Sequence, residues 1–456
     1  MPGVQSRRMP PFSHCAEVIL MASPYRALLG TAIPLFLTSI TGTIGSIVGL
    51  YVLSHHSTAT LAAFAVAMAV LTPVSSTVTG AVRGLVPFVA PYRSHPADAA
   101  PILRDARWLT LCIGTAGAVA VAAIPWITRL TGVSDDVINQ LGTLPWLLAL
   151  YVLVFAANSG TRAMLISLGR SRQVLWSGLV ATGADIVLTV MLVPVMGVEG
   201  AGVALVAASA SSAVVTHLAL RSVPGLGVRS LWPGHPRPAE VLRLARVSIP
   251  MAGTVLMKFG VLAVVTYAAA SGGTTAAAAH ALLNSMVGFL FLIAFSLAQA
   301  SVPEIARAAS TTEVRSINRA ALNLGLAGGA CGAIVLLGFG DPLFRLFSPD
   351  DGVRALALSL VPLLIAAVLA DSGGAVMGFS LTGLKRSGWN VTSFALSYGL
   401  LAAAAYPATY LCGLPGLWGM IVLSNTLLAV LQGAGFWLFS RRISVETEPE
   451  RARTKS

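Results

Sequence analysis

Charged residues are what this sequence has least of. Only 10% of its 456 residues are Asp, Glu, Lys or Arg, and 56% are hydrophobic. Ordinary soluble domains carry about 25% charged residues. The mean hydropathy of the chain is +0.81. A soluble fold of this length would need a far more polar surface, so the composition places the chain in a lipid bilayer.

Three further features are missing from the sequence, and each of these absences excludes a class of protein. The four cysteines are scattered without disulfide or metal-ligand spacing, at Cys15, Cys112, Cys331 and Cys412. No Gly-x-x-x-x-Gly-Lys-Ser/Thr loop for ATP phosphates is present. The polar connections are too short to hold a catalytic domain. We therefore expect no enzyme activity, no cofactor and no metal.

Apolar runs long enough to cross a membrane recur along the whole chain. A helical span needs about 20 consecutive apolar residues, whereas a membrane β-barrel would show alternating segments of about 10. The runs are continuous and rich in Ala, Leu and Val. The sequence predicts an all-α polytopic membrane protein with about twelve transmembrane helices, at residues 27–53, 58–83, 106–130, 141–163, 173–195, 198–220, 244–270, 276–303, 318–340, 355–382, 389–412 and 415–440.

One long polar connection divides these spans into six and six. It contains several Pro, Gly and Arg residues between Arg221 and Arg243. The predicted organisation is a cytoplasmic N-terminus, an N-lobe, an inter-lobe linker, a C-lobe and a basic cytoplasmic tail, over residues 1–26, 27–221, 222–243, 244–440 and 441–456.

The basic residues are distributed unevenly across the predicted membrane. Of the 29 Lys and Arg residues, 25 fall on the side that holds both termini and three on the other, with Lys258 alone inside a span. Cytoplasmic segments collect Lys and Arg. We therefore expect a multi-pass protein of the cell membrane with both termini in the cytoplasm. This distribution accounts for the net charge of +12 without nucleic acid.

The two halves of the sequence repeat each other at a constant offset of 216 residues. Ile33-Pro34 coincides with Ile249-Pro250, Arg170-Ser171 with Arg386-Ser387, and Gly197 with Gly413. Because each half has an even number of spans, the halves are parallel repeats, an architecture found in secondary transporters.

Short motifs in these positions resemble the MATE (multidrug and toxic compound extrusion) family. This family belongs to a superfamily that includes multidrug transporters and oligosaccharidyl-lipid and polysaccharide flippases. The motifs are Ala32-Ile33-Pro34, Ser248-Ile249-Pro250, Thr60-Leu61-Ala62-Ala63, Gly197 to Ala204, Gly383 to Arg386 and Ser397-Tyr398. The resemblance implies a V-shaped exporter that moves amphipathic, often cationic compounds outward against an inward flow of H⁺ or Na⁺.

Three charged residues lie near the middle of predicted spans: Asp185, Lys258 and Asp371. Lys258 is 12 residues beyond Arg246, or about 18 Å along a helix, past the middle of a core of about 30 Å. Charges at this depth are costly, and each is a candidate functional site.

The resemblance assigns roles to these positions, with departures. An acid expected in the first span falls on Gly49, and the Asn and Asp expected in the fifth span fall on Asp185 and Thr189. The acid expected in the seventh span falls on Lys258, and the Asp of the tenth is Asp371. Since an ammonium group repels Na⁺, we favour H⁺ as the coupling ion. A purely structural ion pair between Lys258 and Asp371 stays open, as does a structural role for Asp185.

Sulfur and aromatic side chains adapt to ligands of varied shape. Several could line an apolar cavity, although packing against helices or lipid is the more common role for any one of them: Met257, Phe259, Met286, Phe289, Phe291 and Met377.

The sequence thus favours a secondary active exporter of small amphipathic compounds, working by proton antiport. We expect a monomer whose partners are this substrate, H⁺ and membrane lipid. A lipid-linked oligosaccharide or lipid-precursor flippase is the first alternative, and it would require more cations in the central cavity. A non-transporting membrane receptor or scaffold is the second.

Overall fold

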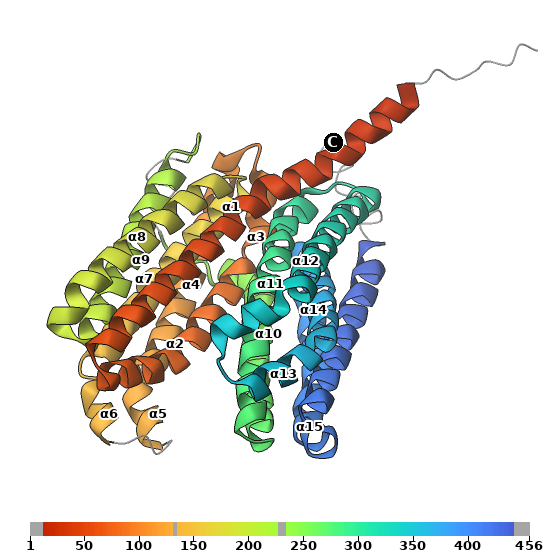
Figure 1. Ribbon diagram of the computed structural model, residues 1–456. Coiled ribbons are helices and arrows are strands. Elements are labelled where there is room, and N and C mark those ends of the chain that lie inside the picture. Colours follow the sequence, from red (N-terminus) through yellow and green to blue (C-terminus); the bar gives the residue numbers. More distant parts are fainter. Residues whose placement is uncertain (1–11, 131–134, 227–233, 442–456) are drawn as a thin grey trace, which may run out of the picture.

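The computed structural model describes residues 12–130, 135–226 and 234–441, and this part of the chain contains helices and no strand. Figure 1 shows two groups of helices side by side, one from red to yellow-green and one from green to blue. The predicted all-α membrane fold is confirmed.

The N-terminal group consists of nine α-helices and two short 3-10 helices. They are α1 (Phe12–His56), α2 (Thr58–Arg83), α3 (Val86–Val89), η1 (Ala90–Tyr92), η2 (Pro96–Ala99), α4 (Ala100–Ala122), α5 (Ile124–Leu130), α6 (Asp135–Gln140), α7 (Leu144–Ser167), α8 (Ser171–Met196) and α9 (Val198–Arg221).

The C-terminal group consists of six helices, of which α13 is short. They are α10 (Pro238–Ser271), α11 (Thr274–Arg307), α12 (Thr311–Phe347), α13 (Asp351–Ser359), α14 (Val361–Gly383) and α15 (Ser387–Ser440).

Twelve membrane spans follow from these helices. Within the described residues, ten helices are long and apolar enough to cross a bilayer, and α4 with α5 forms an eleventh, bent by 44°. The 54 residues of α15 include Gly413, whose φ of 63° and ψ of −155° are not helical. An unbroken helix of this length would measure about 80 Å, far more than a hydrocarbon core of about 30 Å. The break at Gly413 therefore divides α15 into two spans.

The predicted tenth span begins too early. We expected it to start at residue 355, but α14 begins at Val361, and the preceding residues form the separate helix α13. Pro362 stands at the start of α14, where its missing N–H costs nothing. Its ring disfavours a continuous helix from α13, because proline in a helix interior clashes with the preceding turn.

The 216-residue repeat extends to unusual backbone conformations. Gly197 has φ 59° and ψ −134°, and Gly413, 216 residues later, has φ 63° and ψ −155°. Gly169 has φ 76°, and its counterpart Lys385 has φ 58°. Lys385 is the one non-glycine residue with positive φ in the described part of the chain. Because these unusual backbone conformations occur at equivalent positions, the backbones of the two halves follow the same path at these turns.

The breaks between helices repeat as well. The bend after α4 is at Ala123, and α12 is broken at Phe339, 216 residues later. The pairs Thr58 and Thr274, Asp135 and Asp351, and Ser171 and Ser387 each begin a helix. The lobe and linker boundaries expected from the sequence remain a proposal, although this repetition supports a division near the middle of the chain.

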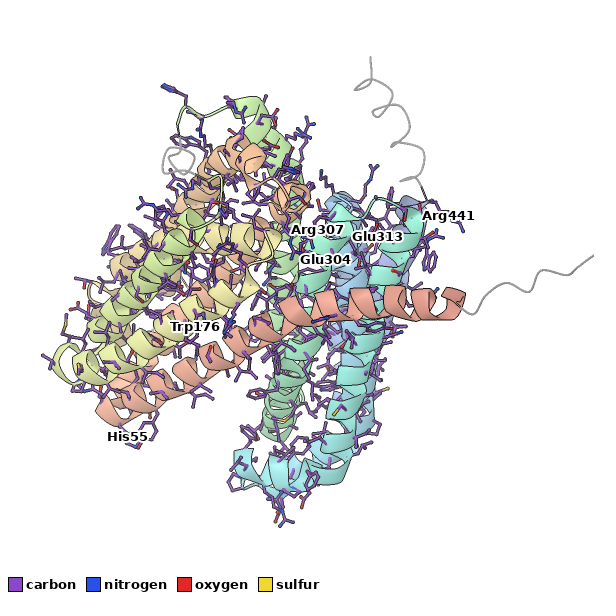
Figure 2. The ribbon with its side chains drawn as sticks, turned by 90° about the horizontal axis from the view of Figure 1, so that it is seen from above. His55, Trp176, Glu304, Arg307, Glu313 and Arg441 are labelled. Carbon is purple, nitrogen blue, oxygen red and sulfur yellow. The ribbon has the colours of Figure 1, made fainter. Side chains whose placement is uncertain are left out.

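The two groups contact each other closely at one end, which we call the arginine-rich end because Arg93, Arg170, Arg307 and Arg386 lie there. Arg307 donates to the carbonyl oxygen of Ser167 at 3.3 Å, and Arg93 lies 3.8 Å from Glu304, which also pairs with Arg307. Figure 2 places Glu304 and Arg307 between the two groups. Toward the opposite end, where His55 lies, the groups diverge (Figure 1).

Helix α1 crosses from one group to the other. Its residues Leu28 and Ala32 are buried in a cluster with Leu297 and Phe436 of the C-terminal group, and α1 also packs along α8 of the N-terminal group. Figure 2 shows α1 running across both groups toward His55. The helix therefore joins the two groups at the arginine-rich end.

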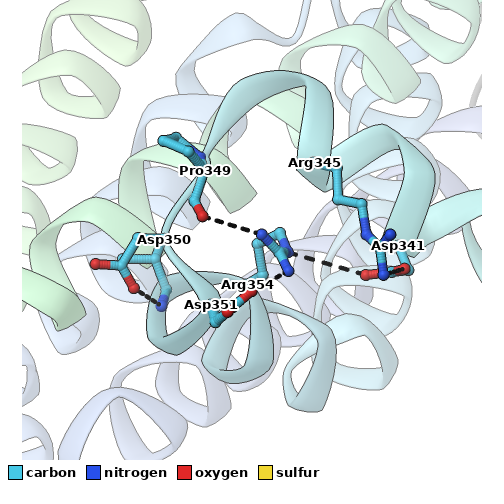
Figure 3. Close-up of polar contacts among 7 residues, drawn as sticks. Asp341, Arg345, Pro349, Asp350, Asp351 and Arg354 are labelled. Atoms are coloured by element: carbon cyan, nitrogen blue, oxygen red, sulfur yellow. Dashed lines mark hydrogen bonds and ion pairs between the residues drawn. The ribbon is translucent and has the colours of Figure 1, made fainter.

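At the end of the molecule opposite the arginine-rich end, basic side chains near α13 are paired with acidic side chains close by. Arg345 lies 2.8 Å from Asp341, and Arg354 pairs with Asp351 and donates to the carbonyl oxygen of Pro349 at 3.1 Å (Figure 3). Asp350 accepts from the backbone N–H of Val353 at 3.0 Å, which caps α13. Two of the three basic residues assigned to this side by the sequence thus have carboxylate partners.

Candidate functional site

A central cavity of about 590 Å³ lies mainly within the C-terminal group and reaches α2 and α7. Its walls come from α10, α11, α14 and α15, and the N-terminal group contributes Ser75, Ser76, Thr79, Arg83 and Phe155. Much of the wall is apolar and aromatic, with Phe259, Phe291, Phe295, Phe379 and Phe394. Small-molecule sites have this combination of an apolar wall and few polar groups.

The polar centre of this cavity is an ion pair between Lys258 on α10 and Asp371 on α14. The Lys258 ammonium lies 3.0 Å from Oδ2 and 3.3 Å from Oδ1 of Asp371. Asp371 is the eleventh of the 23 residues of α14, so the pair is near the middle of the span. The two residues that the sequence placed in the same half are thus in direct contact.

The ammonium group has two further neighbours. It lies 4.8 Å from the ring centroid of Phe291, close enough for a cation–π interaction. The hydroxyl of Tyr398 on α15 lies beside it as well. The side chain of Lys258 is 28% exposed and that of Asp371 is 9% exposed. A substrate or water in the cavity can therefore reach the lysine more easily than the acid.

A hydrogen-bonded amide cluster lines the same cavity between α14 and α15, and sequence reasoning missed it. Asn390 donates to the carbonyl oxygen of Gly378 at 2.7 Å, and Gln432 donates to the side-chain oxygen of Asn390 at 3.0 Å. The signal was available, since these polar residues interrupt otherwise apolar spans. Both side chains are uncharged, however, so the presence of a charge in mid-span did not mark them.

Asp185 and Thr189 lie elsewhere, on α8 of the N-terminal group. A Cβ built on Gly45 of α1 would lie 3.6 Å from Oδ2 of Asp185, so this carboxylate faces α1. Asp185 forms no hydrogen bond or ion pair with another described residue, and Thr189 is 4% exposed. The resemblance implies an acid at the position of Gly49. A Cβ built on Gly49 would have no neighbouring heavy atom within 4 Å. Neither Asp185 nor Thr189 lines the central cavity.

The expected apolar lining is found only in part. Phe259 and Phe291 line the cavity. Met286 is buried in the core of the C-terminal group, Phe289 is 47% exposed on its surface, and Met377 packs beside Asn318. Met257 does not line the cavity either. A helix carries side chains on all sides, and the sequence did not tell which side of α10 or α11 faces the cavity.

Arg83 and Arg162 lie deeper than expected. Both belong to the basic residues that the charge distribution of the sequence predicts on the cytoplasmic side. In the structure both line a smaller pocket between the two groups, which adjoins the central cavity. No three side chains of the described residues gather as ligands for a metal ion.

A groove of about 530 Å³ lies on the N-terminal group between α4, α7 and α9. Its lining includes Leu111, Val214 and Leu218, which are each more than half exposed, and it contains no acidic residue. Such a groove on the outside of the helices suits a lipid chain better than a transported solute. The central cavity is therefore the stronger candidate site.

Known proteins resemble this chain in sequence over most of its length. The MatE family matches residues 250–406. A probable multidrug resistance protein NorM of Aromatoleum aromaticum is 26% identical over 422 residues, which are 84% of this chain and 87% of the relative. A protein of the same name from Xanthomonas campestris is 25% identical and covers 92% of this chain and 95% of its own length.

Solved structures share the fold. A MOP superfamily transporter from Pyrococcus furiosus, described by a reverse polarity of its binding pocket, superposes with a TM-score of 0.83 and 15% identity, over 92% of this chain and 97% of that one. The Vibrio cholerae MATE transporter VcmN in its bent form has a TM-score of 0.81 and 16% identity, over 93% and 99%.

Proposed function

Because the chain belongs to the MatE family of membrane transporters, we propose that it exports small amphipathic organic compounds in exchange for protons. The observation that carries this proposal is the central cavity, with its aromatic wall and the Lys258–Asp371 pair at its centre. Relatives bearing the name multidrug resistance protein support the same substrate class.

The direction of transport rests on the placement of the two ends. We propose that the arginine-rich end is cytoplasmic, because basic residues are retained on that side during insertion. The inter-group contacts of Arg93, Glu304 and Arg307 then close the cytoplasmic end. The cavity would receive substrate when these contacts open and release it to the outside when they are closed.

Protons suit the central site better than sodium ions. A hard cation requires several oxygen ligands in one place, whereas the carboxylate of Asp371 is already bound by the Lys258 ammonium. A proton arriving at Asp371 would release Lys258, and the lysine could then interact with another group of the cavity. Asp185, which forms no ion pair among the described residues and has Tyr151 as an electrostatic neighbour, is a second proton acceptor in this scheme.

The test is transport by the purified protein in lipid vesicles. A pH gradient imposed in sodium-free buffer should drive accumulation of a fluorescent amphipathic probe, and collapsing the gradient should stop it. Protein-free vesicles give the background. Accumulation that requires Na⁺ and ignores the pH gradient would refute proton coupling while leaving transport itself supported.

One observation favours the alternative function, that of a flippase. This function requires cations in the central cavity besides Lys258. Arg83 lines that cavity, and Arg162 lines the pocket that adjoins it. A flippase would carry a lipid-linked diphosphate across the bilayer, and vesicle assays with a labelled lipid precursor would detect this activity. The receptor or scaffold reading is set aside, because the chain belongs to a family of transporters.

A further inference from the structure

Two arginine side chains face the space between the helix groups. Arg83 is the last residue of α2, and its guanidinium carbon lies 4.5 Å from the ring centroid of Phe295 and 5.6 Å from that of Phe379, both in the C-terminal group. Arg162, on α7, lines the same pocket. Both positive charges therefore face the same pocket.

Neither arginine has an acidic partner among the described residues. The Nε atom of Arg83 is buried and has no hydrogen-bond partner. Three other arginines of this end do have acidic partners, since Arg93 and Arg307 pair with Glu304, and Arg237 pairs with Asp105. A buried charge without a partner is costly. Arg83 and Arg162 are both half-buried and line one pocket, so an anion bound there would compensate two positive charges at once.

The pocket that holds them is suited to one small anionic group. Its volume is about 170 Å³, and none of its lining residues is Asp or Glu. The hydroxyls of Thr38, Ser39 and Thr79 donate to carbonyl oxygens of their own helices. The remaining donors that face the pocket are the two guanidinium groups together with Ser159 and Gln299.

This pocket is continuous with the central cavity. Thr79, Arg83, Phe155, Phe295 and Phe379 line both spaces. A ligand can therefore place a charged group between the arginines and an apolar body against the aromatic wall. The combined site has a cationic end and an apolar end, which is the complement of an amphipathic anion.

We propose that Arg83 and Arg162 form a binding site for the carboxylate or phosphate group of an amphipathic organic anion whose apolar part occupies the central cavity. This assignment rests on the proposed export function and specifies the charge of its substrate. Guanidinium groups bind both kinds of oxyanion through paired hydrogen bonds. The Lys258–Asp371 pair, internally neutral, is left for coupling.

The competing explanation is that both arginines serve only to orient the protein in the membrane. Topogenic arginines extend their side chains to the water at the membrane surface. Arg83 instead lies over two aromatic rings of the opposite helix group. Its position is therefore unsuited to that role alone.

The first test needs no mutation. The intact protein in lipid nanodiscs is equilibrated with pyrenebutyrate, with a pyrene monophosphate, and with a pyrenebutyl-trimethylammonium cation of similar size, and binding to empty nanodiscs is subtracted. At least one anion should bind about tenfold more tightly than the cation, as expected for a charge-assisted contact. The stronger anion identifies the preferred group. Tighter binding of the cation would overturn the proposal.

The second test uses variants of the two arginines. Arg83→Gln with Arg162→Gln should weaken anion binding by about tenfold or more and leave cation binding unchanged. Arg83→Lys with Arg162→Lys keeps the charge and should retain part of the affinity. Arg246→Gln, at an exposed position, is the matched control and should have no effect. Equal anion binding by the double Gln variant and the control contradicts the proposal.

Transport assays distinguish a failure of the proposed anion site from a failure of the proposed export function. Export of the cationic probe together with arginine-independent anion binding would refute the anion site and leave the exporter intact. If no probe is transported while anion binding depends on Arg83 and Arg162, the exporter proposal fails and the anion site stands.

Discussion

Lys258 and Asp371 lie 113 positions apart in the sequence and 3.0 Å apart in the structure. Their contact joins α10 to α14 on the wall of the central cavity. Breaking a buried ion pair leaves one charge without compensation, whereas replacing both charges removes the penalty. This asymmetry allows a structural role to be distinguished from a role in coupling.

The first prediction concerns this pair. Lys258→Met and Asp371→Asn should each lower the free energy of unfolding by up to about 3–5 kcal/mol, and the double variant should recover most of the loss. Thermal unfolding of the detergent-solubilised protein measures this recovery. We expect the recovered double variant to be inactive in transport driven by a pH gradient. Normal transport by the double variant would establish a purely structural pair.

The second prediction concerns Asp185. Asp185→Asn should fold and reach the membrane normally, because the amide keeps the shape of the side chain and removes an unpaired charge from the interior. Transport by this variant should lose its dependence on the pH gradient, which vesicle assays at several imposed gradients will measure. Asp98→Asn, the same change at an exposed position, serves as the control. An unchanged pH dependence would leave Asp371 as the remaining candidate for proton coupling.

The third prediction concerns the tight turn between the last two spans. A Cβ on Gly416 would lie 2.6 Å from the carbonyl oxygen of Ala408, whereas a Cβ on Gly419 meets nothing within 4 Å. Gly416→Ala should therefore destabilise the protein by about 1–3 kcal/mol, and Gly419→Ala should be neutral or slightly stabilising. Melting temperatures of the two variants give a direct comparison, and equal values would contradict the close packing at Gly416.

The fourth prediction concerns orientation. In a version with Cys15, Cys112, Cys331 and Cys412 replaced by Ser, Thr275→Cys should react with an impermeant thiol reagent added outside intact cells. Ala309→Cys, at the arginine-rich end, should react only after the cells are opened. Both positions are exposed. The opposite labelling pattern would reverse the proposed direction of the molecule.

Several features followed from the amino-acid sequence alone. Apolar run length decides whether a helix spans a bilayer, so the twelve spans could be counted along the chain. The 216-residue repeat was visible because glycine at Gly197 and Gly413 supplies a backbone conformation that other residues rarely adopt. Mid-span charges are rare and costly, which directed attention to Lys258 and Asp371.

The tertiary structure decided which side chains face the same space. Whether Met286 or Phe291 faces the cavity depends on the rotation of α11 against its neighbours, and an apolar helix in lipid carries no polar face that would indicate this rotation. The role of Arg83 was not predictable from the sequence either. Positive residues near span ends are expected at the cytoplasmic surface, and only the packing of α2 against the C-terminal group turns this one inward, over Phe295. Composition and periodicity act along one helix at a time, whereas a binding site is made where several helices meet.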